Sequence, residues 1–259
     1  MTDNPILQVN NLSKSFGGIS ALKDVSFSIE RGDIAALIGP NGAGKTTAFH
    51  CISGFHRVNT GMICFKGKDI TSLKPHEIVK KGLVLTFQHL RIFGNLTVRE
   101  NILIGKHLVI RSSIFKQCFH VNSAKQEEKR VQMEVDSLLE YFQLLNLSDQ
   151  LADTLPYGKQ KIVALARALS LNPEFLMLDE PASGLNQEET INFAEQLKAI
   201  IREKNLTVLI IEHDMNFVSE LSNRILVLDF GQLIAEGGID EIKNNPKVME
   251  AYLGDETFA

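Results

Sequence analysis

The octapeptide Gly39-Pro-Asn-Gly-Ala-Gly44-Lys45-Thr46 decides the fold of this chain, because it fits the pattern G-x-x-x-x-G-K-[ST] between a predicted strand and a predicted helix. Glycines allow successive backbone N–H groups to converge on phosphate oxygens. The lysine ammonium can reach the β- and γ-phosphates, and the threonine hydroxyl can ligate Mg²⁺. The sequence therefore predicts a site for a nucleoside triphosphate. The residues expected to form it are Gly39, Pro40, Asn41, Gly42, Ala43, Gly44, Lys45, Thr46 and Thr47.

The patterns on either side of this loop alternate between strands and helices. The first thirty residues alternate apolar and polar side chains around Phe16-Gly17-Gly18, which is typical of antiparallel strands joined by a turn. Helical stretches separate the later strands, so the sequence predicts an α/β fold with a parallel sheet. Buried strands are expected where short apolar runs recur, at 33–39, 83–87, 175–178, 207–211 and 225–228.

The segment from Thr97 to about residue 150 is predicted to be largely helical and to interrupt this alternation. Thr97-Val-Arg-Glu100 has the spacing of a capping box, in which the hydroxyl caps the first turn and the glutamate reaches back. Apolar residues then recur at helical spacing, which predicts one face of an amphipathic helix. They are Val131, Val135, Leu138, Leu139, Phe142 and Leu145.

Composition excludes several classes of protein. The 259 residues are 44% apolar and 22% charged, which is ordinary for a globular protein, and the formal net charge of −4 offers no broad positive surface for nucleic acid. Cys51, Cys64 and Cys118 lack metal-ligand spacing and are expected to be free thiols in a reducing compartment. No charge-free apolar run of 18 residues and no secretory signal are present, so a cytoplasmic protein is predicted.

Two further segments follow predicted strands at the sheet edge where the loop lies. Asp179 ends one strand, where a carboxylate is well placed to hold Mg²⁺, and Glu180 can polarise an attacking water. His213 follows another strand, and ligands of open α/β sheets bind at this edge. Alone, the acidic pair is also compatible with a turn and the histidine with a structural role. Together with the loop, the acidic pair predicts phosphoryl-transfer chemistry.

A fourth segment narrows the choice among phosphate-loop proteins. Leu155-Pro-Tyr-Gly158-Lys-Gln-Lys-Ile-Val-Ala-Leu-Ala-Arg-Ala-Leu169 resembles the signature helix of ABC ATPases, and the resemblance extends from about residue 6 to residue 254. It implies a P-loop NTPase with a RecA-like core, an N-terminal antiparallel β subdomain and an inserted helical subdomain. The implied single ABC ATPase domain spans 1–259, with its core at 1–88 and 159–236, the helical subdomain at 89–158 and a C-terminal extension at 237–259.

The resemblance also implies roles for individual residues. Phe16 matches the aromatic residue on which adenine stacks, and Ser183-Gly-Leu-Asn186 matches the loop after the catalytic glutamate. The implied catalytic residues are Glu180, His213 as a donor to the γ-phosphate, and Gln88. The implied ligands of Mg²⁺ are Thr46, Gln88 and Asp179, and the implied nucleotide contacts from the signature segment are Tyr157, Gly158 and Lys159.

The signature segment departs from the common family pattern. Pro156 stands where a serine usually donates to the γ-phosphate, so that hydroxyl is missing. Proline is tolerated at the start of a helix, and the N–H groups from about Gly158 onward can still point at an anion. Lys159 can replace part of the lost positive potential. The contact between the signature segment and ATP is therefore expected to differ in detail from the family pattern.

Within the family, the chain most resembles the ATP-binding subunits of branched-chain amino-acid importers. The segments Leu-x-Tyr-Gly, Ala182–Asn186, Ile211–Met215 and the tail 235–254 carry this resemblance. It implies a head-to-tail dimer around two ATP molecules, formed with a second ABC ATPase subunit or with another copy of the chain. The other implied partners are transmembrane permease subunits and, indirectly, a substrate-binding protein. The implied location is the cytoplasmic face of the inner membrane, as a peripheral subunit with ATP and Mg²⁺ as cofactors.

The segment Lys106–Arg130 holds six lysines or arginines against two glutamates, which suits docking below a permease near anionic headgroups. A solvated helical face is the alternative for each basic residue. Its apolar residues would contact a partner if exposed and anchor the insertion if buried. They include Leu108, Val109, Ile110, Ile114, Phe115 and Phe119.

The sequence is also compatible with other functions. ATPases of urea importers and lipopolysaccharide exporters share much of the pattern, and a non-transport ABC ATPase of an assembly system or of DNA repair is a different class. DNA-repair relatives need long coiled-coil or zinc-bearing insertions, which this chain lacks. A kinase or GTPase would not need the signature helix, and the sequence contains no Asn-Lys-x-Asp guanine-binding motif.

Overall fold

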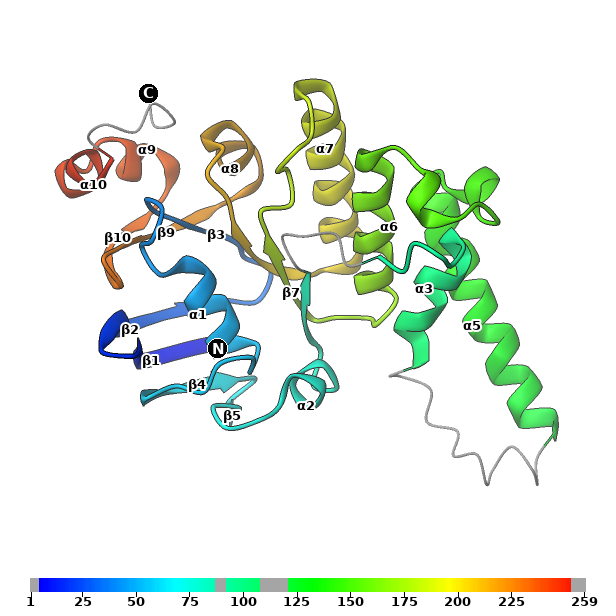
Figure 1. Ribbon diagram of the computed structural model, residues 1–259, viewed down its shortest axis with the longest axis horizontal. Coiled ribbons are helices and arrows are strands. Elements are labelled where there is room, and N and C mark those ends of the chain that lie inside the picture. The colour runs from blue at the N-terminus through cyan, green and yellow to red at the C-terminus, as the bar shows by residue number, and fades with distance from the viewer. Residues whose placement is uncertain (1–4, 87–91, 108–120, 253–259) are drawn as a thin grey trace. The chain divides into compact units, whose positions relative to one another are not determined.

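The computed structural model describes residues 5–86, 92–107 and 121–252. The chain divides into two units, which are Met1–Gln88 with Glu174–Ala259, and His89–Pro173. The first unit holds both β-sheets, and the second is helical (Figure 1).

The larger sheet of the first unit has six strands. Its five parallel strands bring their carboxyl ends to one edge, and the sixth strand, β10, runs antiparallel to its neighbour β9. This arrangement confirms the predicted α/β fold with a parallel sheet. In spatial order the strands are β10 (Gln232–Gly237), β9 (Arg224–Asp229), β3 (Ile34–Ile38), β8 (Thr207–Ile211), β7 (Phe175–Asp179) and β6 (Leu83–Thr86).

The smaller sheet is antiparallel and confirms the predicted N-terminal strand pair. β1 (Leu7–Phe16) and β2 (Ile19–Ile29) pair from Phe16↔Ile19 to Leu7↔Ile29, with the turn at the two glycines between them. β4 (Thr60–Phe65) pairs with the other edge of β1, and β5 (Lys68–Asp69) pairs with β4.

The main core of the first unit lies between these two sheets and includes α1 (Lys45–Ile52). Phe49 and Ile52 of this helix are fully buried, and Leu37 of β3 belongs to the same core. Fully burying one such side chain contributes roughly 1.5–3 kcal/mol to stability. Packing therefore fixes the helix that directly follows the phosphate loop, and Figure 1 shows it beside β1 and β2.

The other face of the large sheet carries a smaller apolar cluster. Ala36 and Ile38 of β3 alternate with Leu37 and so point to this second face. Three helices cover it, α8 (Met215–Leu221), α9 (Ile239–Lys243) and α10 (Pro246–Ala251), through side chains such as Val218, Ile242 and Val248. The first unit also contains α2 (Pro75–Val79) and α7 (Gln187–Lys204).

Helices make up the second unit. α3 (Val98–His107) packs against both α5 (Val121–Tyr141) and α6 (Tyr157–Leu169), and short 3₁₀ turns occupy Leu145–Leu147 and Ala152–Thr154. The predicted capping box begins α3, because the Thr97 N–H donates to Glu100 Oε2 at 2.8 Å and the Glu100 N–H donates to Thr97 Oγ1 at 3.1 Å. None of the helices in the described parts of the chain is long and apolar enough to cross a bilayer.

One detail of the helical segment differs from the sequence-based expectation. The compact second unit runs to Pro173, because α6 packs on α3 and Ser170 Oγ donates to the Ile102 carbonyl at 3.0 Å, and the subdomain limits 89–158 stay a prediction. Five residues of the predicted apolar face on α5 and just after it are buried, whereas Leu145 is 42% exposed because the helix has ended at Tyr141.

The basic segment 106–130 is only partly described, and residues 108–120, with their apolar side chains, lie outside the described ranges. Lys106 does not belong to a solvated face, because it is 2% exposed and forms an ion pair with Glu134. Arg130 lies 3.3 Å from the same carboxylate. At these two positions, positive charge therefore stabilises the packing of α5.

The described cysteines agree with the expectation of free thiols. Cys51 is buried and Cys64 is partly buried, and neither forms a disulfide. Burial raises the pKa of Cys51 to about 11, so this thiol stays protonated at neutral pH. Cys118 lies outside the described residues.

Candidate functional site

The phosphate loop joins the end of β3 to the start of α1, as its sequence predicts. Gly39, Gly42 and Gly44 have φ values of 147°, 82° and 104°, a region that favours glycine. A Cβ atom on Gly39 would lie 2.0 Å from the Leu228 carbonyl oxygen, and one on Gly44 would lie 2.5 Å from the Ala21 carbonyl oxygen. These two glycines are therefore required by the close approach of neighbouring backbone as well as by their φ angles.

The first turn of α1 is arranged to receive an anion. Gly44 is the N-cap residue and has no side chain that could cap the helix, so the first N–H groups lack the usual side-chain acceptor. Such N–H groups and the positive end of the helix dipole favour phosphate. The Lys45 ammonium group lies over the loop, where it donates to the carbonyl oxygens of Gly39 at 2.6 Å and Pro40 at 3.0 Å.

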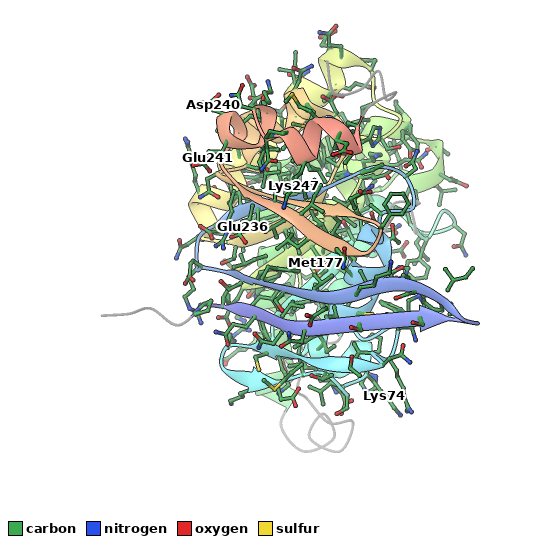
Figure 2. The ribbon with its side chains drawn as sticks, turned by 90° about the vertical axis from the view of Figure 1, so that its left-hand side faces the viewer. Lys74, Met177, Glu236, Asp240, Glu241 and Lys247 are labelled. Atoms are coloured by element: carbon green, nitrogen blue, oxygen red, sulfur yellow. The ribbon has the colours of Figure 1, made fainter. Side chains whose placement is uncertain are left out.

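The β9–β10 hairpin supports the back of the loop. The Gly231 N–H donates to the Ala43 carbonyl at 3.0 Å, and the Gly231 carbonyl accepts from the Lys23 N–H at 2.7 Å. A cavity of about 600 Å³ adjoins this place and is lined by Pro40–Ala43, the turn residues Asp229 and Phe230, and side chains of α10. Figure 2 shows the C-terminal helices lying across the hairpin, with Lys247 on α10. The C-terminal segment thus borders the phosphate loop.

Three neighbouring strands deliver the other polar residues to the same edge. The register sets Leu37 of β3 opposite Ile211 of β8, and Ile211 opposite Asp179 of β7. These three residues are therefore level across the sheet, about 4.8 Å from strand to strand. The phosphate loop, the acidic pair and His213 all begin within two residues of this level, so the structure brings them to one edge.

The acidic pair has an unusual backbone. Asp179 is 6% exposed at the end of β7. Glu180 has a φ of 46°, a left-handed conformation that costs a non-glycine residue roughly 1–2 kcal/mol. Its N–H donates to the Ile211 carbonyl at 2.9 Å, and its carbonyl accepts from the Ser183 N–H at 3.2 Å. The chain therefore turns sharply at Glu180 while staying attached to the neighbouring strand β8.

A buried carboxylate precedes His213. Glu212 is 1% exposed and accepts from the Ala182 N–H at 2.8 Å and from the His213 N–H at 3.1 Å. Burial raises the pKa of Glu212, and these backbone donors oppose the rise. The His213 side chain is 55% exposed, and its Nδ1 lies 3.8 Å from Glu212 Oε2. Sequence reasoning missed Glu212, although an acidic residue directly after an apolar strand is a usable signal.

Phe16 offers an exposed aromatic ring on the first unit. It ends β1, is 43% exposed, and has the Lys14 ammonium group 4.7 Å from the ring centroid. The His56 ring packs edge-on against it at 5.1 Å between centroids, and His50 packs against His56 at 5.0 Å. The ring is thus held by a small cluster that sequence reasoning did not anticipate.

The remaining expected residues lie in the second unit or outside the described residues. Tyr157, Gly158 and Lys159 belong to the second unit, where they form the first turn of α6 behind Pro156 as N-cap. Tyr157 is 44% exposed. Gln88 lies outside the described residues.

The donor set at the sheet edge fits a magnesium ion. Mg²⁺ prefers oxygen ligands and is usually held by one or two protein groups together with phosphates and water. The exposed Thr46 in the first turn of α1 offers a hydroxyl, and Asp179 offers a carboxylate at the end of a strand two positions away in the sheet. Both groups have the required chemistry.

Comparison with known sequences gives similar proteins over nearly the whole chain. A family model described as ABC transporter matches residues 22–183, and one described as branched-chain amino acid ATP-binding cassette transporter matches residues 232–257. The high-affinity branched-chain amino acid transport ATP-binding protein BraF of Pseudomonas aeruginosa is 38% identical over 251 residues, covering 97% of this chain and 98% of the relative. The corresponding protein LivG of Escherichia coli is 39% identical with the same coverage.

Solved structures agree with the sequence comparison. A nucleotide-free ATP-binding cassette from an ABC transporter has a TM-score of 0.82 at 35% identity, covering 97% of this chain and 100% of the other. The ADP conformation of another such cassette has a TM-score of 0.84 at 34% identity, with the same coverage. These matches confirm the predicted P-loop NTPase fold of an ABC ATPase. With the family model spanning more than half of the sequence and relatives this similar along nearly all of it, the chain belongs to the ABC transporter family as an ATP-binding cassette protein.

Proposed function

We propose that this chain is the ATP-hydrolysing subunit of an importer for branched-chain amino acids. The names of its relatives and the match of its tail at residues 232–257 support the substrate class. The observation that best supports hydrolysis is the strand register, in which Leu37, Ile211 and Asp179 lie side by side on three neighbouring parallel strands. That register gathers a phosphate loop, an acidic pair and a histidine at one edge, as phosphoryl transfer to water requires.

The loop Gly39–Thr47 would bind the triphosphate of ATP. Its backbone N–H groups and the first turn of α1 receive the phosphate oxygens, and the Lys45 ammonium moves from the loop carbonyl groups to the β- and γ-phosphates. Phe16 would stack on adenine, because its ring is exposed and already held by His56. Stacking does not read the hydrogen-bonding edge of the base, so ATP and GTP should differ only modestly in affinity.

Thr46, Asp179 and Gln88 would hold Mg²⁺ beside the phosphates. When bound, Mg²⁺ neutralises charge on the β- and γ-phosphates. Glu180 would take a proton from the attacking water at its carboxylate while the water oxygen bonds to the γ-phosphorus. The bond from that phosphorus to the β,γ-bridging oxygen would break, so that ADP leaves and inorganic phosphate forms. His213 would donate a hydrogen bond from its imidazole to a γ-phosphate oxygen, since this ring is exposed beside the same edge.

A head-to-tail dimer would complete the site. Tyr157, Gly158 and Lys159 of one subunit would contact the ATP held by the other, through N–H groups of the first turn of α6 and the Lys159 charge. The partner is a second ABC ATPase subunit or another copy of this chain. The helical segment would act as a subdomain inserted in the core, and residues 237–259 as a C-terminal extension, whose helices α9 and α10 contact the hairpin behind the loop.

The subunit would work on the cytoplasmic face of the inner membrane below transmembrane permease subunits. A substrate-binding protein would deliver the amino acid on the other side, and no nucleic acid takes part. ATP binding would close the dimer and hydrolysis would open it, so the permeases would pass through their conformations in a fixed order. The basic helical insertion is the proposed docking surface, by charge complementarity with anionic headgroups.

The decisive experiment isolates the native complex by affinity purification of this chain from membranes and reconstitutes it in lipid vesicles. ATP hydrolysis is then measured with the co-purified binding protein loaded with leucine, isoleucine, valine or urea. Stimulation by the branched-chain amino acids supports the proposal. Stimulation by urea, or co-purification with only soluble assembly factors or lipopolysaccharide-export permeases, contradicts it.

A further inference from the structure

The carboxylate of Glu212 joins two segments that extend beyond the sheet edge. Its Oε1 accepts from the Ala182 N–H at 2.8 Å, two residues after Glu180, and its Oε2 accepts from the His213 N–H at 3.1 Å. The backbone N–H of Asp214 also hydrogen-bonds to it. A single buried side chain thus receives donors from the segment after β7 and from the segment after β8.

The sheet does not hold these segments together by itself. The strand pairing of β7 and β8 ends at Asp179↔Ile211, and the Glu180 N–H makes one further bond, to the Ile211 carbonyl at 2.9 Å. Both segments then leave the strand conformation. The first does so at Glu180, which has a φ of 46°, and the second at Asp214, whose side chain accepts from the Asn216 N–H and caps α8. The bridge through Glu212 therefore extends the connection past the point where the ladder ends.

A carboxylate suits this position better than any neutral side chain. An ionised carboxylate has only acceptors, and three backbone N–H donors face it here. A glutamine of the same size would turn an NH₂ group toward at least one of those donors. Among the described residues, Glu212 has no lysine or arginine within ion-pair distance, so backbone N–H groups, with the His213 ring at 3.8 Å, compensate its buried charge.

We propose that Glu212 is a positioning residue for ATP hydrolysis, which holds the segment of Glu180 and the segment of His213 in one fixed relation. This inference rests on the proposed function, in which Glu180 accepts the proton of the attacking water and His213 donates to the γ-phosphate. Glu212 is buried and bonds to backbone N–H groups, so it acts through Glu180 and His213. Its contribution is that the two reacting side chains keep a common geometry, where a displacement of about 1 Å can cost up to about 100-fold in rate.

The test compares the assembled transporter carrying the parent chain, Glu212→Gln, Glu212→Asp or the control Glu188→Gln, an exposed glutamate in the first turn of α7. For each protein, kcat and KM of ATP hydrolysis, the Kd of a fluorescent ATP analogue and the melting temperature are measured. We expect Glu212→Gln to lower kcat by about 10- to 100-fold. The Kd should stay within about twofold of the parent, because Glu212 bonds to the segments after β7 and β8, whereas binding depends on Lys45 and the phosphate loop.

Glu212→Asp keeps the charge but is one methylene shorter, so it can reach only one of the two segments and should also lower kcat with little change in Kd. This variant decides the question by the same criterion if Glu212→Gln does not fold. A kcat equal to that of the parent overturns the inference, and so does a general loss in which kcat and the melting temperature fall while Kd rises. If the parent hydrolyses no ATP in the assembled transporter, the proposed function is contradicted instead. This outcome differs from a failure of the Glu212 proposal, because it is seen in the parent before any variant is compared.

Discussion

Lys45 donates from Nζ to the carbonyl oxygens of Gly39 and Pro40, at 2.6 and 3.0 Å. These carbonyl groups hold the ammonium in place over the loop without a triphosphate. A triphosphate offers stronger, charged acceptors at the same place, and charge-assisted hydrogen bonds are roughly twice as strong as neutral ones. Residue by residue, the loop is thus organised around one point charge and three glycines with positive φ.

Replacement of Lys45 by alanine is expected to weaken ATP binding by about 100-fold, since it removes two or more charged contacts worth roughly 1.5–3 kcal/mol each in the absence of compensation. Stability should change little, because the Lys45 side chain is partly exposed and water can replace some of its bonds to the loop. A titration with a fluorescent ATP analogue measures the affinity, with Lys68→Ala, an exposed lysine of β5, as the matched control. Parent-like affinity of Lys45→Ala would show that the loop is not the phosphate site.

At the scale of secondary-structure elements, an ion pair with a buried lysine connects two helices of the second unit. The Lys106 side chain is 3% exposed and pairs with Glu134, whose side chain is 33% exposed, so the pair connects α3 to α5. Removing Glu134 would leave the buried Lys106 charge uncompensated, whereas removing Lys106 leaves a partly exposed carboxylate that still has Arg130 at 3.3 Å.

Glu134→Ala is therefore expected to lower the free energy of unfolding by about 3 kcal/mol, and Lys106→Met by much less. Urea denaturation followed by circular dichroism compares the two variants with Glu140→Ala, a change at an exposed position of the same helix. Equal losses for Glu134→Ala and Lys106→Met would mean that packing, and not the uncompensated charge, determines the cost.

The start of β7 is joined to the rest of the first unit by Glu174. The hydrogen bond from the Lys66 side chain, followed by the charges of Lys66 and Arg31, lowers the pKa of this carboxyl below its ordinary value of 4.5. A carboxylate with a lowered pKa in the folded state stabilises the protein above its ordinary pKa. That contribution is lost as the pH falls through the lowered value.

The melting temperature of Glu174→Gln should accordingly lie below that of the parent at pH 7, and the gap should close as the pH falls below about 4.5. The effect should be modest, because nearly half of the side chain is exposed and water screens the charges. Differential scanning calorimetry from pH 7 to about pH 3 measures the gap. A gap that does not depend on pH would contradict this assignment.

The features that could be predicted from sequence are those that depend on neighbours in sequence. The capping box joins Thr97 to Glu100 within one helical turn, and the phosphate loop lies within eight residues. Burial of Lys106 and the bridge from Glu212 could not be predicted, because their partners lie 28 and 30 residues away. The same reason applies to the packing of α6 on α3, which is a tertiary contact that no local pattern encodes.

At the scale of the whole molecule, the site residues fall in two groups. The phosphate loop, the acidic pair and His213 belong to the first unit, and the signature residues belong to the second. We expect this separation to be bridged by a head-to-tail dimer, in which each nucleotide meets the signature segment of the other subunit. Pro156 removes one possible hydroxyl contact there, so a dimer of identical chains is expected to be weaker than a dimer with the cognate second ATPase.

Glu180→Gln is expected to trap the closed dimer when ATP is present, because bound ATP is no longer consumed. Size-exclusion chromatography with light scattering should show a dimer with ATP and a monomer with ADP. The parent protein serves as the control, since it converts ATP to ADP and releases its partner. If identical chains associate too weakly, adding the second ATPase should restore the dimer, and a mixture that stays monomeric with ATP would contradict the shared site.

The rate of ATP hydrolysis by Glu180→Gln in the assembled transporter tests the central claim most directly. The amide keeps the size of the side chain and can hold a water, but it cannot accept a proton, so the rate should fall by about 10²–10⁴-fold. ATP affinity, measured on the same sample, should stay close to that of the parent because Lys45, Thr46 and Asp179 remain. Hydrolysis at the parental rate would contradict the account and leave His213 as the candidate base.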